Sequence, residues 1–299
     1  MKVLLPLLAP RYWGWWIVVG LLWSLTRLPH AAQLRLGRGF GAMAYRLAKR
    51  RRRIAEINIK ACFPELAPDA QQTLVREHFA AMGMGIMEML SAWWCSDAWI
   101  LEQGEMVGLE HLKTALARGK GVMLLTAHFT ALEIGTRFLT MQIPVHASYR
   151  SHENLVFEYV LQKSRAAHAE KAIHRDDVRE MLRSLRKNKA LWFAPDQNFG
   201  HKYSVFARFF GIPAATNTAT ARFAEMTGAV IVPFVTRRQN DRYHVEFFPA
   251  FENYPSGDTF QDAQRVNDWI EAQIREIPEQ YLWTHRRFKD RPEGETPWY

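Results

Sequence analysis

A histidine and a glutamate that could form a proton-transfer pair follow one of the most apolar runs in the sequence. His128 comes directly after Gly121–Ala127, which reads GVMLLTA, and Glu133 stands five positions later. The apolar run predicts a buried strand, and a turn from that strand into a helix would let the carboxylate reach the imidazole. A carboxylate on one ring nitrogen fixes the tautomer and leaves the other nitrogen free to take a proton from an attacking group. This pair is the first candidate for a catalytic site.

Each member of the pair also has an ordinary structural interpretation. Thr130 and Glu133 match the capping-box pattern, in which Thr is the N-cap of a helix and Glu lies at its third position. His128 alone fits a histidine that ends a strand and carries no chemistry. At the level of the sequence, both interpretations stay open.

The elements that would position this pair alternate between strands and helices. We expect strands at 121–127, 145–149, 190–194, 229–236 and 243–248, and helices at 70–100, 130–142, 176–187, 216–227 and 261–276. This alternation predicts an α/β fold with a mostly parallel central sheet flanked by helices. Ligands of such sheets bind beyond the carboxyl ends of the strands, and His128 stands at one of these ends.

Other familiar catalytic motifs are absent from the sequence. There is no G-x-S-x-G nucleophile elbow, no Walker loop and no H-E-x-x-H zinc motif. Gly37, Gly39 and Gly41 do not follow a strand, so they are not a dinucleotide fingerprint, and the histidines lack metal-ligand spacing. The two cysteines exclude a disulfide scaffold and a four-cysteine zinc site. We therefore expect no metal and no cofactor, and direct transfer of a group to an acceptor that His128 activates.

The positive charge of the chain is concentrated near its N-terminus. The net charge is +9, but residues 1–60 carry +11 and the remaining residues −2. This distribution excludes a uniformly basic nucleic-acid-binding protein, and we expect no nucleic-acid partner. Residues 12–26 are uncharged and contain four tryptophans. They predict an N-terminal hydrophobic membrane helix, which either spans the bilayer or lies in its interface.

This distribution of charged and apolar residues predicts three parts of the chain. We expect residues 1–33 to form a membrane anchor helix, residues 34–60 a basic amphipathic segment on anionic lipids, and residues 61–299 the α/β catalytic domain. Since the basic run Lys49–Arg53 lies after the apolar segment, the positive-inside rule predicts that the catalytic domain is on the cytoplasmic side.

The segment Thr126–Glu133 resembles the H-x4-D/E motif of the lipid A biosynthesis acyltransferases, a branch of the wider glycerolipid acyltransferase group. Three further blocks strengthen the resemblance. Ala194–Gly200 is similar to the APD block of that family, and Phe210–Thr216 is similar to its phosphosugar-side loop. Glu279–Lys289, with 291–294 after it, resembles the C-terminal signature.

The resemblance implies a membrane-bound acyltransferase at the cytoplasmic face of the inner membrane. In this family, a fatty acyl group moves from acyl carrier protein to the hydroxyl of a 3-hydroxyacyl chain on a lipid A precursor. The lauroyl-type enzymes, which act on the Kdo-bearing tetra-acyl precursor, are the most similar branch. Carried over to this sequence, His128 is the general base, Glu133 orients it, and Asp196 and Arg150 line the site.

Acyl transfer also needs a cation or N–H groups to stabilise the oxyanion of the tetrahedral intermediate. Arg150 and Arg165 are our candidates for this role. Acyl carrier protein is acidic, and a basic cluster at one predicted helix end could bind it, although the same charges could simply complement the helix dipole. The cluster consists of Arg183, Arg186, Lys187 and Lys189.

Two other functions remain open at this level. One is an acyltransferase that acts on a lysophospholipid or another glycolipid. The other is a cationic membrane-binding protein without catalytic activity, in which His128 would be dispensable.

Overall fold

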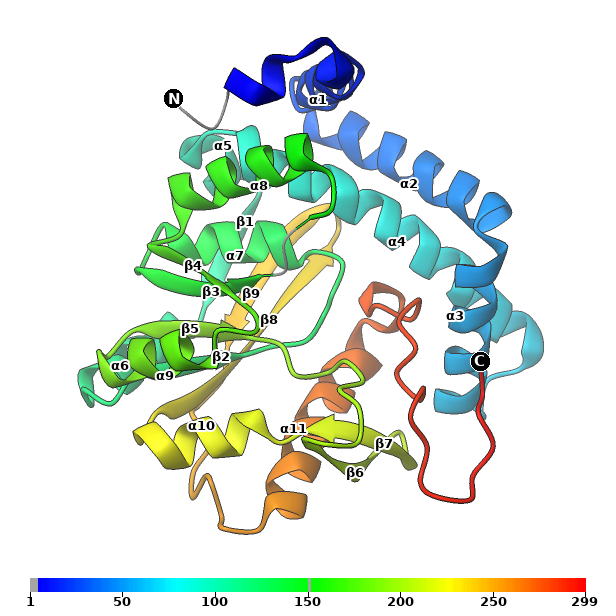
Figure 1. Ribbon diagram of the computed structural model, residues 1–299. Coiled ribbons are helices and arrows are strands. Elements are labelled where there is room, and N and C mark those ends of the chain that lie inside the picture. Colours follow the sequence, from blue (N-terminus) through cyan, green and yellow to red (C-terminus); the bar gives the residue numbers. More distant parts are fainter. Residues whose placement is uncertain (1–4, 150–151) are drawn as a thin grey trace.

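A seven-stranded sheet forms the centre of the computed structural model, which describes residues 5–149 and 152–299 (Figure 1). The strand order is β1-β9-β8-β2-β5-β3-β4, and every neighbouring pair is parallel except β8 with β9. The prediction of a mostly parallel α/β sheet flanked by helices is confirmed. The strands are β1 (Gly104–Val107), β2 (Val122–Leu125), β3 (Val145–Tyr149), β4 (Lys171–His174), β5 (Ala190–Phe193), β8 (Val230–Gln239) and β9 (Arg242–Phe247).

Helices cover both faces of this sheet because its central strands are apolar on both sides. Met123 and Leu125 of β2 belong to a core with α9, α10 and α11, whereas Val122 and Leu124 belong to a second core with α6 and α7. This pattern is expected of a strand that is buried on both faces. The helices are α5 (Asp97–Glu102), α6 (Leu109–Ala117), α7 (Leu132–Thr140), α8 (Leu155–His168), α9 (Val178–Arg186), α10 (Ala219–Thr227) and α11 (Thr259–Glu276).

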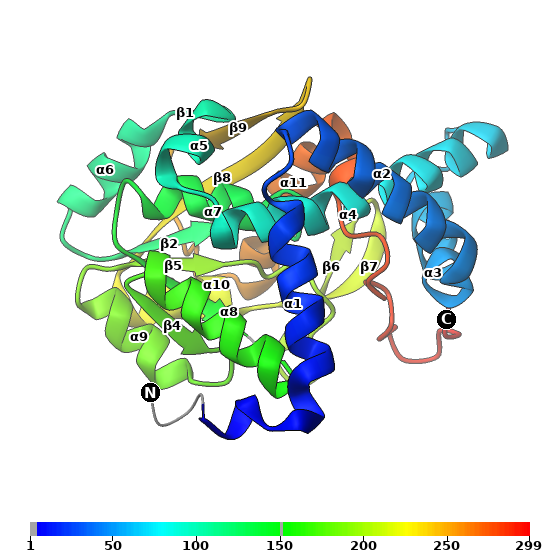
Figure 2. The same cartoon turned by 90° about the horizontal axis from the view of Figure 1, so that it is seen from above.

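The N-terminal helices pack along the outside of this α/β core. They are α1 (Trp13–Leu25), α2 (His30–Leu47), α3 (Lys49–Cys62) and α4 (Pro68–Trp94). α2 lies on α4 at a contact made by glycines, since a Cβ on Gly83 would lie 2.0 Å from the carbonyl oxygen of Gly37. The N-terminal end of α1 approaches one end of α8 in Figure 2, and Trp15 and Trp16 contact Phe157 and Tyr159 of α8 edge to face.

The predicted spanning form of the N-terminal membrane helix is not supported. Among the described residues, none of the helices combines the length and the apolar character needed to cross a bilayer. α1 has 13 residues, and at about 1.5 Å per residue it is roughly 20 Å long, against a hydrocarbon core of about 30 Å. The chain then bends after Thr26 and begins α2 at His30, so the two helices do not join into one longer segment.

Short elements complete the described chain. A two-stranded antiparallel hairpin, β6 (Ser204–Phe209) with β7 (Ile212–Asn217), packs against α11. The 3-10 helices are η1 (Leu5–Leu8), η2 (Pro10–Tyr12) and η3 (Pro278–Gln280), and the last of these leads into the C-terminal segment.

Candidate functional site

Two neighbouring parallel strands bring His128 and Asp196 together. β2 ends at Leu125 and β5 ends at Phe193, and these two residues are partners in the sheet. His128 lies three residues after the end of β2, and Asp196 lies three residues after the end of β5. Because the carboxyl ends of parallel strands meet at the same edge, residues far apart in the sequence converge here.

The contact between them is a pair of hydrogen bonds. Nδ1 of His128 lies 2.6 Å from Oδ1 of Asp196, and the main-chain N–H of His128 donates to Oδ2 of the same carboxylate at 3.1 Å. The Asp196 side chain is 2 % exposed, whereas the His128 side chain is 28 % exposed. Asp196 therefore accepts the Nδ1 proton and fixes the tautomer of the ring. This leaves Nε2 as the nitrogen that can accept a proton from a substrate.

The pair shifts the pKa values of both groups. Burial alone would lower the pKa of His128, but the Asp196 charge and its hydrogen bond raise it above 6.5 overall. Burial alone would raise the pKa of Asp196, but the His128 charge, the two hydrogen bonds and the nearby Arg287 lower it overall. Asp196 is therefore a carboxylate at neutral pH, and it stabilises the imidazolium that forms when His128 takes a proton.

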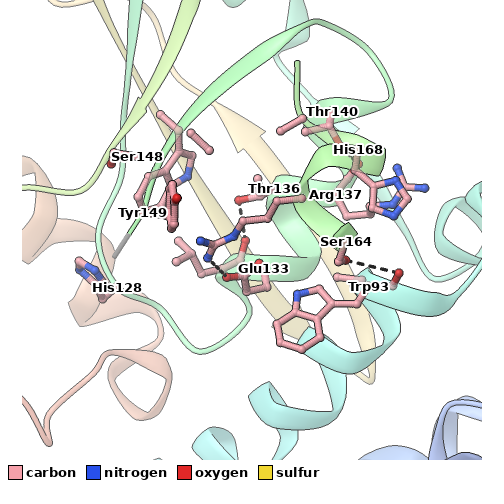
Figure 3. Close-up of a pocket in the computed structure, with 16 residues that line it drawn as sticks. Trp93, His128, Glu133, Thr136, Arg137, Thr140, Ser148, Tyr149, Ser164 and His168 are labelled. Atoms are coloured by element: carbon pink, nitrogen blue, oxygen red, sulfur yellow. Dashed lines mark hydrogen bonds and ion pairs between the residues drawn. The ribbon is translucent and has the colours of Figure 1, made fainter. Parts of the chain in front are cut away.

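Glu133 does not have the position that the sequence suggested. Its carboxylate lies 3.2 Å from the guanidinium of Arg165 in α8, and Asp196 is the carboxylate bonded to His128. The loop between β2 and α7 turns away from the histidine, so the first turn of α7 directs Glu133 toward α8 (Figure 3). The capping-box interpretation was also wrong, because the N-cap of α7 is Ala131 and no side chain caps it.

A cavity of about 340 Å³ opens beside His128. His128 and Glu133 line it, as Figure 3 shows. Arg165 lines it as well, and its guanidinium lies over the ring of Tyr149 at 5.4 Å. The remaining lining side chains come mainly from α4, α7, α8 and β3. The structure thus brings His128, Asp196, Glu133 and Arg165 into one region. Arg150, the other candidate for oxyanion stabilisation, lies outside the described residues.

Sequence reasoning missed the part of the site that comes from the C-terminus. Tyr281 forms an isolated antiparallel bridge with Phe129, next to the catalytic histidine candidate. The main-chain N–H of Asn198 donates to Nε2 of His285, and burial lowers the pKa of His285 to about 4. The only sequence signal for these residues was the similarity of 279–289 to a family signature, which assigned them no role.

The parallel sheet, the His–Asp pair at its carboxyl edge and the cavity beside that pair indicate an α/β enzyme. The profile of the family described as "Bacterial lipid A biosynthesis acyltransferase" matches residues 1–290. This chain belongs to that family, and it is an acyltransferase of lipid A biosynthesis.

Relatives with different acyl groups in their names align along almost the whole chain. The "Lipid A biosynthesis lauroyltransferase" of Escherichia coli (strain K12) is 38 % identical over 96 % of this chain and 95 % of the relative. The "Lipid A biosynthesis palmitoleoyltransferase" of the same organism is also 38 % identical, over 98 % and 96 %. The "Lipid A biosynthesis myristoyltransferase" of that organism is 27 % identical, over 96 % and 90 %.

Proposed function

We propose that this protein moves a fatty acyl group from acyl carrier protein to the hydroxyl of a 3-hydroxyacyl chain on a Kdo-bearing lipid A precursor, with His128 as the general base. The observation that carries this proposal is the buried Asp196 carboxylate 2.6 Å from Nδ1 of a partly exposed His128 at a cavity. The full-length similarity to a lauroyltransferase and a palmitoleoyltransferase supports this reaction type.

The proposed reaction uses His128 first as a base and then as an acid. Nε2 of His128 takes the hydroxyl proton while the oxygen attacks the thioester carbonyl and forms the new C–O bond. The tetrahedral intermediate then collapses, the C–S bond breaks, and Nε2 returns the proton to the leaving thiolate. Asp196 stabilises the imidazolium between these two steps. The ester and the free thiol balance the reaction without any other reactant.

Arg165 is the group in the cavity best suited to the oxyanion. Its Nη1 is buried and has no hydrogen-bond partner among residues 5–149 and 152–299, whereas its Nη2 is bonded to Glu133. The guanidinium therefore keeps one N–H group that no described residue uses, and this is the donor that we assign to the oxyanion. In this proposal, Glu133 acts through Arg165, which it holds in place, instead of through His128.

Substitution of the base tests the reaction. We expect His128→Ala to lower kcat about 100- to 10,000-fold, the range of general-base contributions, while the protein stays folded. His111→Ala on α6, at the opposite edge of the sheet, is the control and should retain full activity. Full activity of His128→Ala would refute the assignment of His128 as the general base.

Donor and acceptor are tested by exchange of each substrate. The purified enzyme should prefer acyl-acyl carrier protein to acyl-coenzyme A, and a Kdo-bearing precursor to a lysophospholipid or a simpler glycolipid. In cells that lack the protein, mass spectrometry of lipid A should reveal the loss of one acyl chain. The wild-type gene should restore that chain and the His128→Ala gene should not. Transfer to a lysophospholipid alone would favour the second acceptor class.

The N-terminal helices supply a surface for the cytoplasmic face of the inner membrane. Apolar side chains are exposed along α1 and α2, and exposed arginines lie among them. This combination favours a surface that lies in the lipid interface and attracts anionic headgroups. The apolar members are Trp13, Trp15, Ile17, Leu21, Trp23, Leu36, Phe40, Met43 and Leu47, and the arginines include Arg27, Arg35 and Arg46.

Vesicle sedimentation tests this surface. We expect binding to anionic vesicles that weakens with salt, and loss of binding in the double variant Ile17→Asp/Leu21→Asp. Met226→Asp, which changes an equally apolar exposed residue of α10, should bind as the wild type does. Equal binding of all three proteins would refute interfacial docking through α1.

The basic cluster at the end of α9 is better explained by local ion pairs than by acyl carrier protein. Arg183 pairs with Glu180, and Lys189 pairs with Glu170 at 2.6 Å. In addition, α9 leads into the start of β5, at the edge of the sheet opposite His128. We expect Arg186→Glu/Lys187→Glu to leave the KM for acyl-acyl carrier protein unchanged. A severalfold rise in that KM would indicate that the basic cluster is the docking site for acyl carrier protein.

A further inference from the structure

The C-terminal segment that begins at η3 is bonded to both loops that build the site. Its first part pairs with the loop of the base: the main-chain N–H of Thr130 donates to the carbonyl oxygen of Gln280 at 2.8 Å, and the N–H of Leu282 donates to the carbonyl oxygen of His128 at 3.0 Å. Its second part contacts the loop after β5, which carries Asp196. One continuous stretch of chain therefore links the loop of the base to the loop of its carboxylate.

His285 makes the contact with the Asp196 loop. The main-chain N–H of Asn198, two residues after Asp196, donates to Nε2 of His285 at 3.0 Å. Because a main-chain N–H can only donate, Nε2 is the acceptor, and Nδ1 carries the proton of the neutral ring. Burial lowers the pKa of His285 to about 4, so the imidazole is neutral at pH 7 and Nε2 keeps the lone pair that this bond needs.

This bond is the main-chain anchor of the loop. Among the described residues, no other hydrogen bond reaches the main chain of residues 195–199. The side chain of Asn198 is held separately: its amide donates to Oδ2 of Asp290 at 2.7 Å, and its oxygen accepts the main-chain N–H of Asp290 at 3.2 Å. The backbone between Asn198 and Asp196 therefore depends on His285 for its position.

The backbone that carries His285 is itself fixed to α3. Nδ2 of Asn58, a residue that is 1 % exposed, donates to the carbonyl oxygens of Trp283 and His285 at 2.7 and 2.8 Å. The N–H of His285 donates to the carbonyl oxygen of Leu282 at 3.2 Å. The imidazole thus projects from a backbone that is bonded to a helix and to its own turn, which makes it a rigid acceptor.

We propose that His285 is a positioning residue of the transfer reaction: its Nε2 holds the main chain of Asn198 and thereby fixes the loop that presents Asp196 to His128. This inference rests on the proposed role of His128 as the base. Asp196 bonds His128 through both carboxylate oxygens, at 2.6 and 3.1 Å, so a displacement of its loop would disturb both bonds at once. A misplacement of about 1 Å can cost about 100-fold in rate, so a group that prevents it supports catalysis without contact with the substrate.

Two substitutions of His285 separate its acceptor from its bulk. The side-chain oxygen of glutamine can replace Nε2 as an acceptor, whereas leucine fills similar space and accepts no hydrogen bond. We expect His285→Leu to lower kcat about 10- to 100-fold with KM nearly unchanged, and His285→Gln to retain most of the wild-type kcat.

The pH profile gives a second readout of the same pair of variants. The acid limb of kcat/KM should move to lower pH in His285→Leu and stay in place in His285→Gln, because a displaced Asp196 stabilises the imidazolium of His128 less. The charged or titratable groups near His285 are Asp196, His128, Arg287 and Arg51, and both variants keep all of them. A shift in His285→Leu alone therefore reports the position of Asp196.

Hydrogen exchange gives a readout that does not depend on activity. The amide of Asn198 should exchange slowly in the wild type and in His285→Gln, and faster in His285→Leu, because leucine leaves it without an acceptor. Mass spectrometry of peptides that contain Asn198 measures this difference. Equal exchange in the three proteins would overturn the inference.

His30→Leu is a matched control. Nε2 of His30 lies 3.0 Å from the main-chain carbonyl oxygen of Asp241, and burial also lowers the pKa of this histidine. The contact again joins a histidine side chain to the main chain of a distant segment, but the described residues that line the cavity include neither His30 nor Asp241. We expect His30→Leu to lower the melting temperature and leave kcat and its pH profile as in the wild type. Losses of activity that follow melting temperature equally in His30→Leu and His285→Leu would overturn the positioning role.

A double substitution and the His128 variant separate this inference from the function on which it depends. In an Asp196→Asn background, His285→Leu should cost less than about twofold more, because the carboxylate that it positions is absent. A full additional loss in that background would overturn the positioning role. If His128→Ala is inactive while His285→Leu keeps the wild-type kcat and pH profile, only the inference fails. If His128→Ala is fully active, the proposed role of His128 itself fails.

Discussion

The carboxylate of Asp196 holds both the side chain and the main chain of His128. One oxygen lies 2.6 Å from Nδ1 and the other accepts the main-chain N–H at 3.1 Å. Rotation of the imidazole and displacement of its loop would therefore each break a hydrogen bond to a charged, buried acceptor, and such bonds are stronger than neutral ones. The position of the proposed base is fixed by a residue 68 positions away in the sequence.

The first prediction concerns the pH dependence of the wild-type enzyme. A general base must be neutral, and Asp196 raises the pKa of His128 above its ordinary value of 6.5. Activity should therefore increase as pH rises through this raised pKa, with the midpoint of the acid limb above 6.5 in a plot of kcat/KM against pH. His285 does not contribute to this limb, because burial keeps its pKa at about 4. A midpoint below 6 would contradict the assignment of His128 as the base.

The second prediction concerns Asp196→Asn. The amide preserves the size of the side chain but removes the charge that stabilises the imidazolium, so kcat should fall roughly 100- to 10,000-fold. In the residual activity, the midpoint of the acid limb should move to lower pH. Glu133→Gln is the comparison: it should lower kcat without moving that midpoint, because Glu133 contacts Arg165 instead of His128. A displaced midpoint in Glu133→Gln and none in Asp196→Asn would return the orienting role to Glu133.

The sequence singled out His128 but not Asp196 as the carboxylate that is bonded to it. His128 could be predicted because an apolar run of seven residues ends directly before it, and local composition is enough to identify such a strand. Its partner depends on the pairing of β2 with β5 and on their register, which are tertiary properties. Glu133 was predicted to be the partner because it lies near His128 in the sequence. The turn at 129–131 separates the side chains of His128 and Glu133 in space.

Most of the central sheet could also be predicted, because local apolar runs identify its buried strands. The strand at Val145–Tyr149 was predicted with the observed bounds, and the other buried strands within a few residues. The hairpin of β6 and β7 was missed, although the Phe210-Gly211 turn, with φ of 53° and 75°, is typical of a tight hairpin. Edge strands β1 and β4 were missed as well, because their residues are only partly buried and their composition is mixed.

The third prediction concerns the glycine contact between α2 and α4. A Cβ on Gly41 would lie 2.1 Å from the carbonyl oxygen of Phe79, so Gly41→Ala should push the two helices apart and destabilise the protein by about 1–3 kcal/mol. Gly39, on the exposed side of the same helix, has nothing within 4 Å of the corresponding position. Gly39→Ala should therefore stabilise by about 0.5–1 kcal/mol through helix propensity. Urea denaturation of both variants measures the difference, and equal effects would contradict close helix packing.

The fourth prediction compares two ion pairs. Glu88 of α4 and Arg238 of β8 form a pair whose side chains are 1 % and 5 % exposed, whereas Arg38 and Asp241 are 46 % and 43 % exposed. Glu88→Gln leaves a buried guanidinium without a counter-charge and should cost about 3–5 kcal/mol. Asp241→Asn should cost less than about 1 kcal/mol, because water screens the exposed pair. Similar losses from both substitutions, measured by chemical denaturation, would be inconsistent with the burial of Glu88.

The fifth prediction concerns His78, a buried histidine in α4. Nδ1 of His78 lies 3.2 Å from the carbonyl oxygen of Glu279, and burial lowers its pKa from 6.5 to about 4. Between these two pH values the unfolded chain binds a proton at this position and the folded protein does not. The free energy of unfolding should therefore fall as pH decreases from 6.5 to 4, by roughly 3 kcal/mol for this single group.

His78→Gln isolates this contribution, because glutamine can still donate to the carbonyl oxygen of Glu279 but does not titrate. The variant should be less stable than the wild type at pH 7, because glutamine fills the buried position of the imidazole less well. It should lose less stability on acidification. The quantity to compare is the slope of the unfolding free energy against pH between 6.5 and 4, which should be shallower by up to one proton in the variant. Identical slopes would mean that His78 is protonated in the folded protein, and the packing of α4 against the C-terminal segment at Glu279 would then have to admit a buried charge.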